Sequence, residues 1–205
     1  MSPGLLLHAR SRGLYSDLAV LTAIAVLAPL ALRALGHAGP EAAGGLLLNL
    51  VVMTTAVGVA RAGQGLAGAD PELESSVPRI GPGFRLAHLA IALLAVGGLL
   101  VLGFGLLMPD GYEPGRSDQL WIVVRDTAGL FGLTAAASAV LGARFSPAPA
   151  AVWVLALTFT SLPRSGWRQA AAMPKSEADA KLAALVAIAL LIVGATAYTA
   201  RRISR

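Results

Sequence analysis

The chain has 205 residues, of which 56% are hydrophobic and only 13% are charged, and its net charge is +5. So few charged residues cannot supply the polar helix faces that a water-soluble domain of this length needs. The sequence contains no cysteine, which excludes disulfides, thiol catalysis, iron–sulfur clusters and cysteine-ligated zinc. The basic residues sit at the ends of apolar segments rather than in one patch, which argues against nucleic-acid binding.

Six apolar stretches of membrane-spanning length follow one another along the chain. A transmembrane helix needs about 20 mostly apolar residues, and the mean hydropathy of +0.72 agrees with that interpretation. The stretches are Leu18–Leu35, Ala42–Ala60, Leu86–Met108, Leu120–Leu141, Ala148–Leu162 and Leu182–Ala200. None carries an ionisable residue near its middle, which argues against ion coupling and intramembrane catalysis. The expected fold is an all-α, polytopic membrane protein whose six-helix transmembrane domain covers residues 18–205.

Residues 1–17 are too short and too polar to span a membrane. Their apolar and polar residues separate on a helix, so we expect a short interfacial amphipathic helix on the inner leaflet, with a polar tail as the alternative. With the N-terminus inside, the inner connections hold nine Lys or Arg residues and the outer connections seven. The positive-inside rule therefore predicts that both termini are cytoplasmic.

The segment 61–85 is the longest connection between apolar stretches, and it faces the cytoplasm in this topology. Asp70 followed by Pro71 is a typical helix start, and Glu72 and Glu74 suit the positive end of a helix dipole. We expect a short polar helix parallel to the membrane, with an ordinary solvated loop as the alternative.

Arg125 and Asp126 form the one notable charged pair within an apolar stretch, near the outer end of the fourth. Adjacent helical residues point about 100° apart, so the two need not bind each other. Each could instead pair across helices or line an aqueous vestibule, and the alternative is that they snorkel to the outer surface. In the same stretch Ala128, Gly132 and Ala136 predict close helix packing, within the bundle or across a dimer.

The connections after the fourth and fifth apolar stretches differ in length. Residues 144–147 predict a very tight turn, whereas the longer stretch 164–181 contains an Ala-rich part that could return partway into the outer interface.

No phosphate-binding loop is present in the sequence, so any nucleotide energy must come from another chain. The three histidines lie in different segments, which argues against a haem or metal cluster.

Several short motifs resemble those of small six-span actinobacterial membrane proteins, the permease subunits of type V ABC exporters. The motifs are Ala69-Asp70-Pro71-Glu72-Leu73-Glu74, Arg79, Arg85-Leu86-Ala87-His88-Leu89, Arg125-Asp126-x-x-Gly129-Leu130-x-Gly132-Leu133 and Leu141-Gly142-Ala143-Arg144. The resemblance covers nearly the whole chain in layout, but each motif is short.

The resemblance implies a multi-pass protein of the bacterial cytoplasmic membrane that exports a hydrophobic, peptide or drug-like substrate, as in antibiotic resistance. This chain would not be an enzyme and would hold no metal or cofactor, because ATP and magnesium would bind a separate ABC ATPase subunit. A second permease copy or a paralogue would complete the transporter. The resemblance also implies site residues: Asp70, Glu72, Glu74, Arg79, Arg85 and His88 in the ATPase-coupling loop, and Arg125 and Asp126 on the transport path.

Two other functions fit the same layout. One is the substrate-binding six-span subunit of a vitamin importer, which would need a polar pocket near the outer side. The other is a non-transporting membrane assembly or immunity protein, which would have no ATPase partner.

Overall fold

The computed structural model describes residues 14–36, 40–66, 82–107, 116–159, 170–176 and 179–200. Within these ranges the regular structure is entirely helical. The α-helices are α2 (Leu14–Gly36), α3 (Pro40–Leu66), α5 (Pro82–Leu107), α6 (Arg116–Leu141), α7 (Ala148–Phe159) and α9 (Lys181–Ala200), and two short 3₁₀ helices are η1 (Ala143–Phe145) and η2 (Met173–Lys175). Each α-helix coincides with one of the six predicted apolar stretches, and the all-α prediction is confirmed.

Several helix boundaries differ from the sequence prediction. Helix α2 begins at Leu14, so residues 14–17 belong to the first long helix rather than to a separate interfacial segment. Residues 1–13 lie outside the described part of the chain. Helix α3 continues to Leu66 and α5 begins at Pro82, which shortens the expected loop 61–85 to residues 67–81. That segment, with the polar helix expected in it, also lies outside the described residues.

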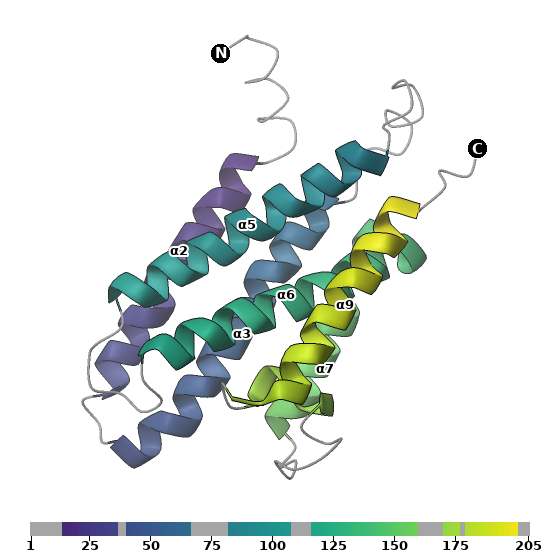
Figure 1. Cartoon of the computed structure of the whole chain (residues 1–205). Coiled ribbons are helices and arrows are strands. Elements are labelled where there is room, and N and C mark those ends of the chain that lie inside the picture. Colours follow the sequence, from purple (N-terminus) through teal and green to yellow (C-terminus); the bar gives the residue numbers. More distant parts are fainter. Residues whose placement is uncertain are drawn as a thin grey trace.

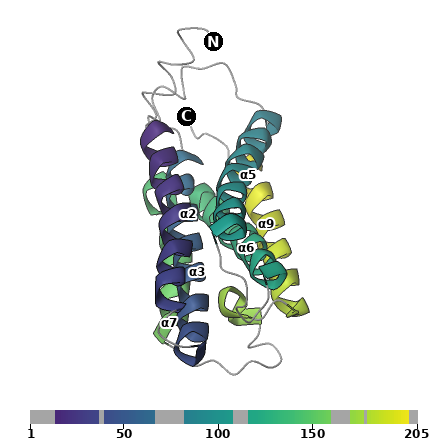
Figure 2. The ribbon, with the colours of Figure 1, turned by 90° about the vertical axis from the view of Figure 1, so that its left-hand side faces the viewer.

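Successive α-helices run in alternating directions along one bundle (Figures 1 and 2). Helices α2 and α5 begin, and α3 and α9 end, at the same end of the bundle, which we call the proximal end. Helices α6 and α9 begin at the opposite end, which we call the distal end. The connection 67–81 therefore joins two helix ends on the proximal side.

Three of the described helices, α5, α6 and α9, are long and apolar enough to span a membrane by length and composition. The described parts of α2 and α7 are apolar over the shorter stretches Ala19–Ala31 and Ala148–Phe159. Three helices thus have the length and composition of membrane spans, and the full count of six spans and the cytoplasmic location of both termini stay predictions.

Large apolar side chains cover the outside of the bundle. Leu94 and Leu106 on α5 are 72% and 76% exposed, and Phe159 on α7 is 84% exposed. Leaving such side chains in water rather than burying them costs about 1.5–3 kcal/mol each, whereas lipid tails solvate them well. The outer surface of the described helices is therefore suited to a bilayer.

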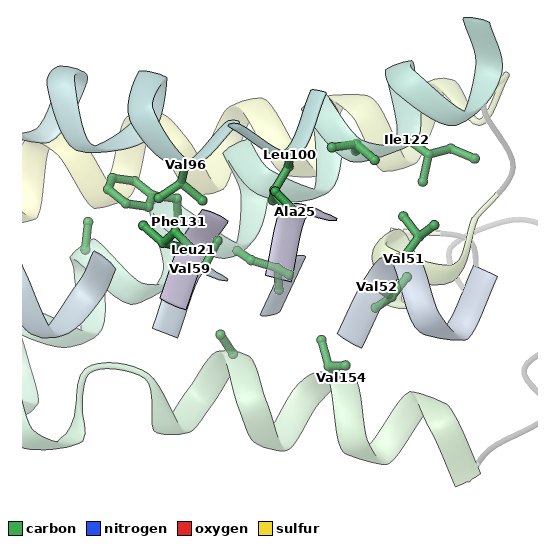
Figure 3. Close-up of a cluster of buried hydrophobic side chains, with 14 of the residues drawn as sticks. Leu21, Ala25, Val51, Val52, Val59, Val96, Leu100, Ile122, Phe131 and Val154 are labelled. Carbon is green, nitrogen blue, oxygen red and sulfur yellow. The ribbon is translucent and has the colours of Figure 1, made fainter. Parts of the chain in front are cut away.

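The hydrophobic core lies where α6 meets its neighbours. Leu21 from α2, Val59 from α3, Leu100 from α5, Phe131 from α6 and Val154 from α7 are all buried in it (Figure 3). In α6, 67% of the apolar window is buried, against 28% in α5 and 22% in α9. Helix α6 is thus the central helix of the bundle, although it is the least apolar of the three candidate spans.

Glycines allow two helix pairs to approach to backbone contact. A Cβ atom at Gly194 of α9 would lie 2.7 Å from the carbonyl carbon of Gly132 on α6, and one at Gly103 of α5 would lie 2.8 Å from the carbonyl carbon of Ala25 on α2. These separations are too short for any side chain. Gly132 therefore packs within the bundle, which answers the question that the small-residue spacing left open for this position.

The turn between α6 and α7 is as tight as the sequence predicts. Gly142 follows the last residue of α6 with φ of 80°, a left-handed conformation that glycine adopts without steric cost. Helix η1 and two turn residues then lead directly into α7. The hydroxyl of Ser146 donates to the carbonyl of Gly63 at 3.4 Å, which ties this turn to the end of α3.

Candidate functional site

The central helix α6 carries two buried charged side chains in its distal half. Arg125 is 3% exposed and Asp126 is fully buried. Removing an arginine and a carboxylate from water is costly unless the two charges are paired and hydrogen-bonded. The surroundings of this pair therefore decide what it does.

Arg125 and Asp126 form an ion pair with each other. The Nε atom of Arg125 donates to Oδ1 of Asp126 at 3.0 Å, although the two residues are adjacent in the helix. Adjacent helical side chains need not meet, because they point about 100° apart. They meet here because the long arginine side chain can fold back beside the short aspartate, whereas two short side chains 100° apart would diverge.

The same guanidinium binds a segment that is distant in sequence. Nη2 of Arg125 donates to the backbone carbonyls of Met173 and Ser176, both at 2.9 Å. These carbonyls lie at the start of η2 and just after it. One planar group thus joins α6 to residues 170–176, which we call the cap segment. Hydrogen bonds of this charge-assisted kind contribute about 1.5–3 kcal/mol each.

Two further side chains attach the cap segment to α7. Nε1 of Trp153 donates to the carbonyl of Ala171 at 2.9 Å, and Nζ of Lys175 donates to the carbonyl of Leu157 at 2.9 Å. Leu157 lies in the last turn of α7, where backbone carbonyls lack helical partners and attract a cation. Met173, fully buried, reaches the position where a Cβ of Gly129 would be. The cap segment is therefore packed against α6, α7 and α9.

Only one oxygen of the Asp126 carboxylate, Oδ1, accepts a hydrogen bond from a described residue. Its Oδ2 atom has no hydrogen-bond partner among the described residues, and the same holds for the hydroxyl oxygens of Thr127 and Thr134. No group of three His, Cys, Asp or Glu side chains that could hold a metal ion occurs in the described ranges. The hydrogen bonds of Arg125 therefore form a clamp on backbone carbonyls.

Neither Arg125 nor Asp126 lines an aqueous vestibule in this structure, because both side chains are buried. Arg125 does extend toward the distal end, as snorkelling would require, but its guanidinium binds carbonyls of the chain rather than reaching the surface. A place on the transport path stays a prediction for both residues.

Most of the predicted ATPase-coupling residues lie outside the described chain. Asp70, Glu72, Glu74 and Arg79 all fall within residues 67–81. The structure does describe Arg85 and His88. Both are half-buried in the first two turns of α5. Their three-residue spacing places them on one side of the helix.

The structure does not bring the two predicted sets of site residues together. The start of α5, with Arg85 and His88, lies at the proximal end (Figure 1), whereas the Arg125–Asp126 pair lies in the half of α6 that leads from the distal end. The sequence analysis also missed the acceptors in the cap segment. The available signal was indirect: α6 is the least apolar candidate span and carries buried threonines at positions 127 and 134, on one helix face.

Comparison of the chain with protein-family models, with curated proteins and with solved structures finds no match in any of the three.

Proposed function

We propose that this chain is the permease subunit of an ABC exporter. It would cross the bacterial cytoplasmic membrane six times, with both termini inside, and export a hydrophobic, peptide or drug-like substrate. A separate ATPase subunit would bind ATP and magnesium, and a second permease copy or a paralogue would complete the transporter. The proposal starts from the motifs that resemble type V ABC exporters and does not depend on the buried pair of α6.

The proposal rests on one observation: α3 ends directly before residues 67–81 and α5 begins directly after them. Both helices reach the proximal end and both contact the central helix: Gly63 of α3 lies against Thr134, and a Cβ at Gly97 of α5 would lie 3.6 Å from the γ-methyl of Thr127. A force applied to residues 67–81 would therefore reach α6 from two sides. A permease driven by an ATPase outside the membrane needs such a connection.

The apolar outer surface supports the same proposal. Side chains such as Leu94 on α5 and Ile192 on α9 are exposed along helices that are long enough to cross a bilayer. In hydrocarbon every backbone hydrogen bond must be satisfied internally, and continuous helices such as α5 and α9 meet that demand. These features fit any polytopic protein, so they support the location rather than the transport activity.

The test is purification from the native host in mild detergent, followed by identification of the proteins that copurify. We expect an ABC ATPase in stoichiometric amount. The double variant Glu72→Gln/Glu74→Gln and the single variant Arg79→Gln should lose it, because they remove charges from the predicted coupling loop. Asp118→Asn and Asp179→Asn are matched controls: both remove an exposed carboxylate at the distal end and should retain the ATPase.

The outcomes separate the proposed function from its alternatives. An ATPase that is lost from the loop variants and kept in the two controls supports the permease. A lone chain with a bound vitamin would instead indicate the substrate-binding subunit of an importer. A chain that purifies with other membrane proteins and never with an ATPase would indicate an assembly or immunity protein.

A further inference from the structure

The helices of the bundle also pack through contacts that do not involve the buried pair. Replacing a buried ion pair by apolar residues of similar size is often neutral or stabilising, because the cost of desolvating two charges is removed. Helix α6 also has an independent attachment to α9, through the backbone contact between Gly132 and Gly194. The pair must therefore be explained by what it binds.

What the pair binds is the backbone of the cap segment. The carbonyl of Ser176 lies just after η2 and accepts from Nη2 of Arg125, and the carbonyl of Met173 accepts both from Nη2 and from the backbone N–H of Ser176, the latter at 3.2 Å. A guanidinium suits this task because one rigid group can bind a carboxylate through Nε and two carbonyls through Nη2. Asp126 binds Nε and so fixes the orientation of the guanidinium.

We propose that Arg125 is a positioning residue that fixes the cap segment against α6, and that Asp126 orients Arg125 for this role. Without the clamp, the part of the cap segment around Ser176 would leave α6, while Met173 stays packed beside Gly129 and the helices of the bundle stay packed. The cap segment would still be attached to α7 through Trp153 and Lys175. This proposal concerns the described residues alone and is independent of the proposed transport function.

A single introduced cysteine can report on the exposure of the cap segment, because the chain contains no cysteine of its own. Ser176→Cys places a single thiol in the cap segment, at a residue that is 6% exposed, with little change in size. Ser138→Cys places a single thiol within α6 at a residue that is fully buried, and it reports on opening of the whole bundle. Ala171→Cys, at an exposed residue of the cap segment, gives the labelling rate of an accessible thiol.

The clamp is removed by the double variant Arg125→Met/Asp126→Leu, which replaces both charges by apolar side chains of similar length. Labelling by a maleimide is then measured on purified protein in detergent, with the thermal unfolding temperature of each variant. We expect the thiol at position 176 to react at least about tenfold faster, because at least one charge-assisted hydrogen bond is lost. The thiol at position 138 should react as slowly as in the parent.

Conservative variants separate positioning from a general structural effect. Arg125→Lys keeps the charge but has a single nitrogen, so it cannot bind the carboxylate and both carbonyls in the same geometry. We expect it to accelerate labelling at position 176 less than the double variant does. Asp126→Asn keeps the shape of the side chain and an acceptor for Arg125, and its effect should be smaller still.

Three results would overturn the proposal. The thiol at position 176 could stay unreactive in a folded double variant, which would mean that the clamp does not position the cap segment. The thiols at positions 176 and 138 could become reactive together with a lower unfolding temperature, or the double variant could fail to fold, and either result would make the pair a stabilising element of the whole bundle. None of these results bears on copurification with an ATPase, so this proposal and the proposed function fail separately.

Discussion

The backbone contact between α6 and α9 gives the sharpest test of the packing. In Gly194→Ala, the new methyl group would lie 2.7 Å from the carbonyl carbon and 2.8 Å from the Cα of Gly132. Carbon atoms prefer separations of about 3.5–4.0 Å. Both obstructing atoms belong to the backbone, so no side chain can rotate away and the helices themselves must separate.

The expected loss of stability follows from two opposing terms. Alanine is favoured over glycine in a helix by about 1 kcal/mol. Overpacking of a well-packed site typically costs 1–3 kcal/mol, and we take about 3 kcal/mol because the obstruction is backbone. We therefore expect Gly194→Ala to lower the free energy of unfolding by about 2 kcal/mol. For a chain of this length, that loss lowers the unfolding temperature by about 4–8 °C.

The assay is thermal unfolding of the purified protein in detergent, compared with the matched variant Gly98→Ala. Gly98 is an exposed glycine of α5, and a Cβ built on it would meet no other atom within 4 Å. The control should unfold at the parent temperature or slightly above it. If Gly194→Ala and Gly98→Ala unfold at the same temperature, the backbone contact between α6 and α9 is wrong.

Three further predictions concern other parts of the bundle. Gly142→Ala should lower stability by about 1–2 kcal/mol in thermal unfolding, because φ is 80° there, and Gly142→Asn should lower it less because asparagine tolerates this region. Gly63→Ala should be destabilising because its methyl would meet the γ-methyl of Thr134. Adding Thr134→Ser removes that methyl, and the double-mutant cycle should show a coupling of about 0.5–3 kcal/mol; additive effects would refute the contact. Leu94→Arg, at the middle of α5, should oppose membrane insertion by about 2.5–3.5 kcal/mol, measured as the inserted fraction. Leu86→Arg, near the helix end, should insert normally, and equal insertion of both variants would argue against α5 as a span.

The sequence was sufficient to locate the helices, because each contains a continuous apolar stretch, and the exact ends of several helices follow further local signals. Helices α3 and α5 begin at Pro40 and Pro82, as expected for a residue that suits the first helical turn, and α6 ends just before Gly142. Such signals depend only on neighbouring residues. The bounds of the apolar stretches therefore matched the described helices to within a few residues.

The partners of Arg125 could not be predicted in the same way. Met173 and Ser176 are 48 and 51 residues away, and their carbonyls accept its hydrogen bonds as backbone groups that any residue type would supply. No sequence pattern identifies a backbone acceptor. The central position of α6 was accessible in principle, because a span with several polar residues is best accommodated where other helices cover them.

The contacts within the bundle differ in how easily they could change. Backbone contacts join α2 to α5, through Gly103 and Ala25, and α6 to α9, through Gly132 and Gly194. Helices α5 and α6 instead meet at an ordinary separation near Gly97, where a Cβ would lie 3.6 Å from the γ-methyl of Thr127. Packed backbones resist sliding, whereas side chains can change rotamer at little cost. If an ATPase acts on the α3–α5 connection, a displacement of the α2–α5 pair past the α6–α9 pair would preserve both backbone contacts, whereas separating the helices of either pair would break one.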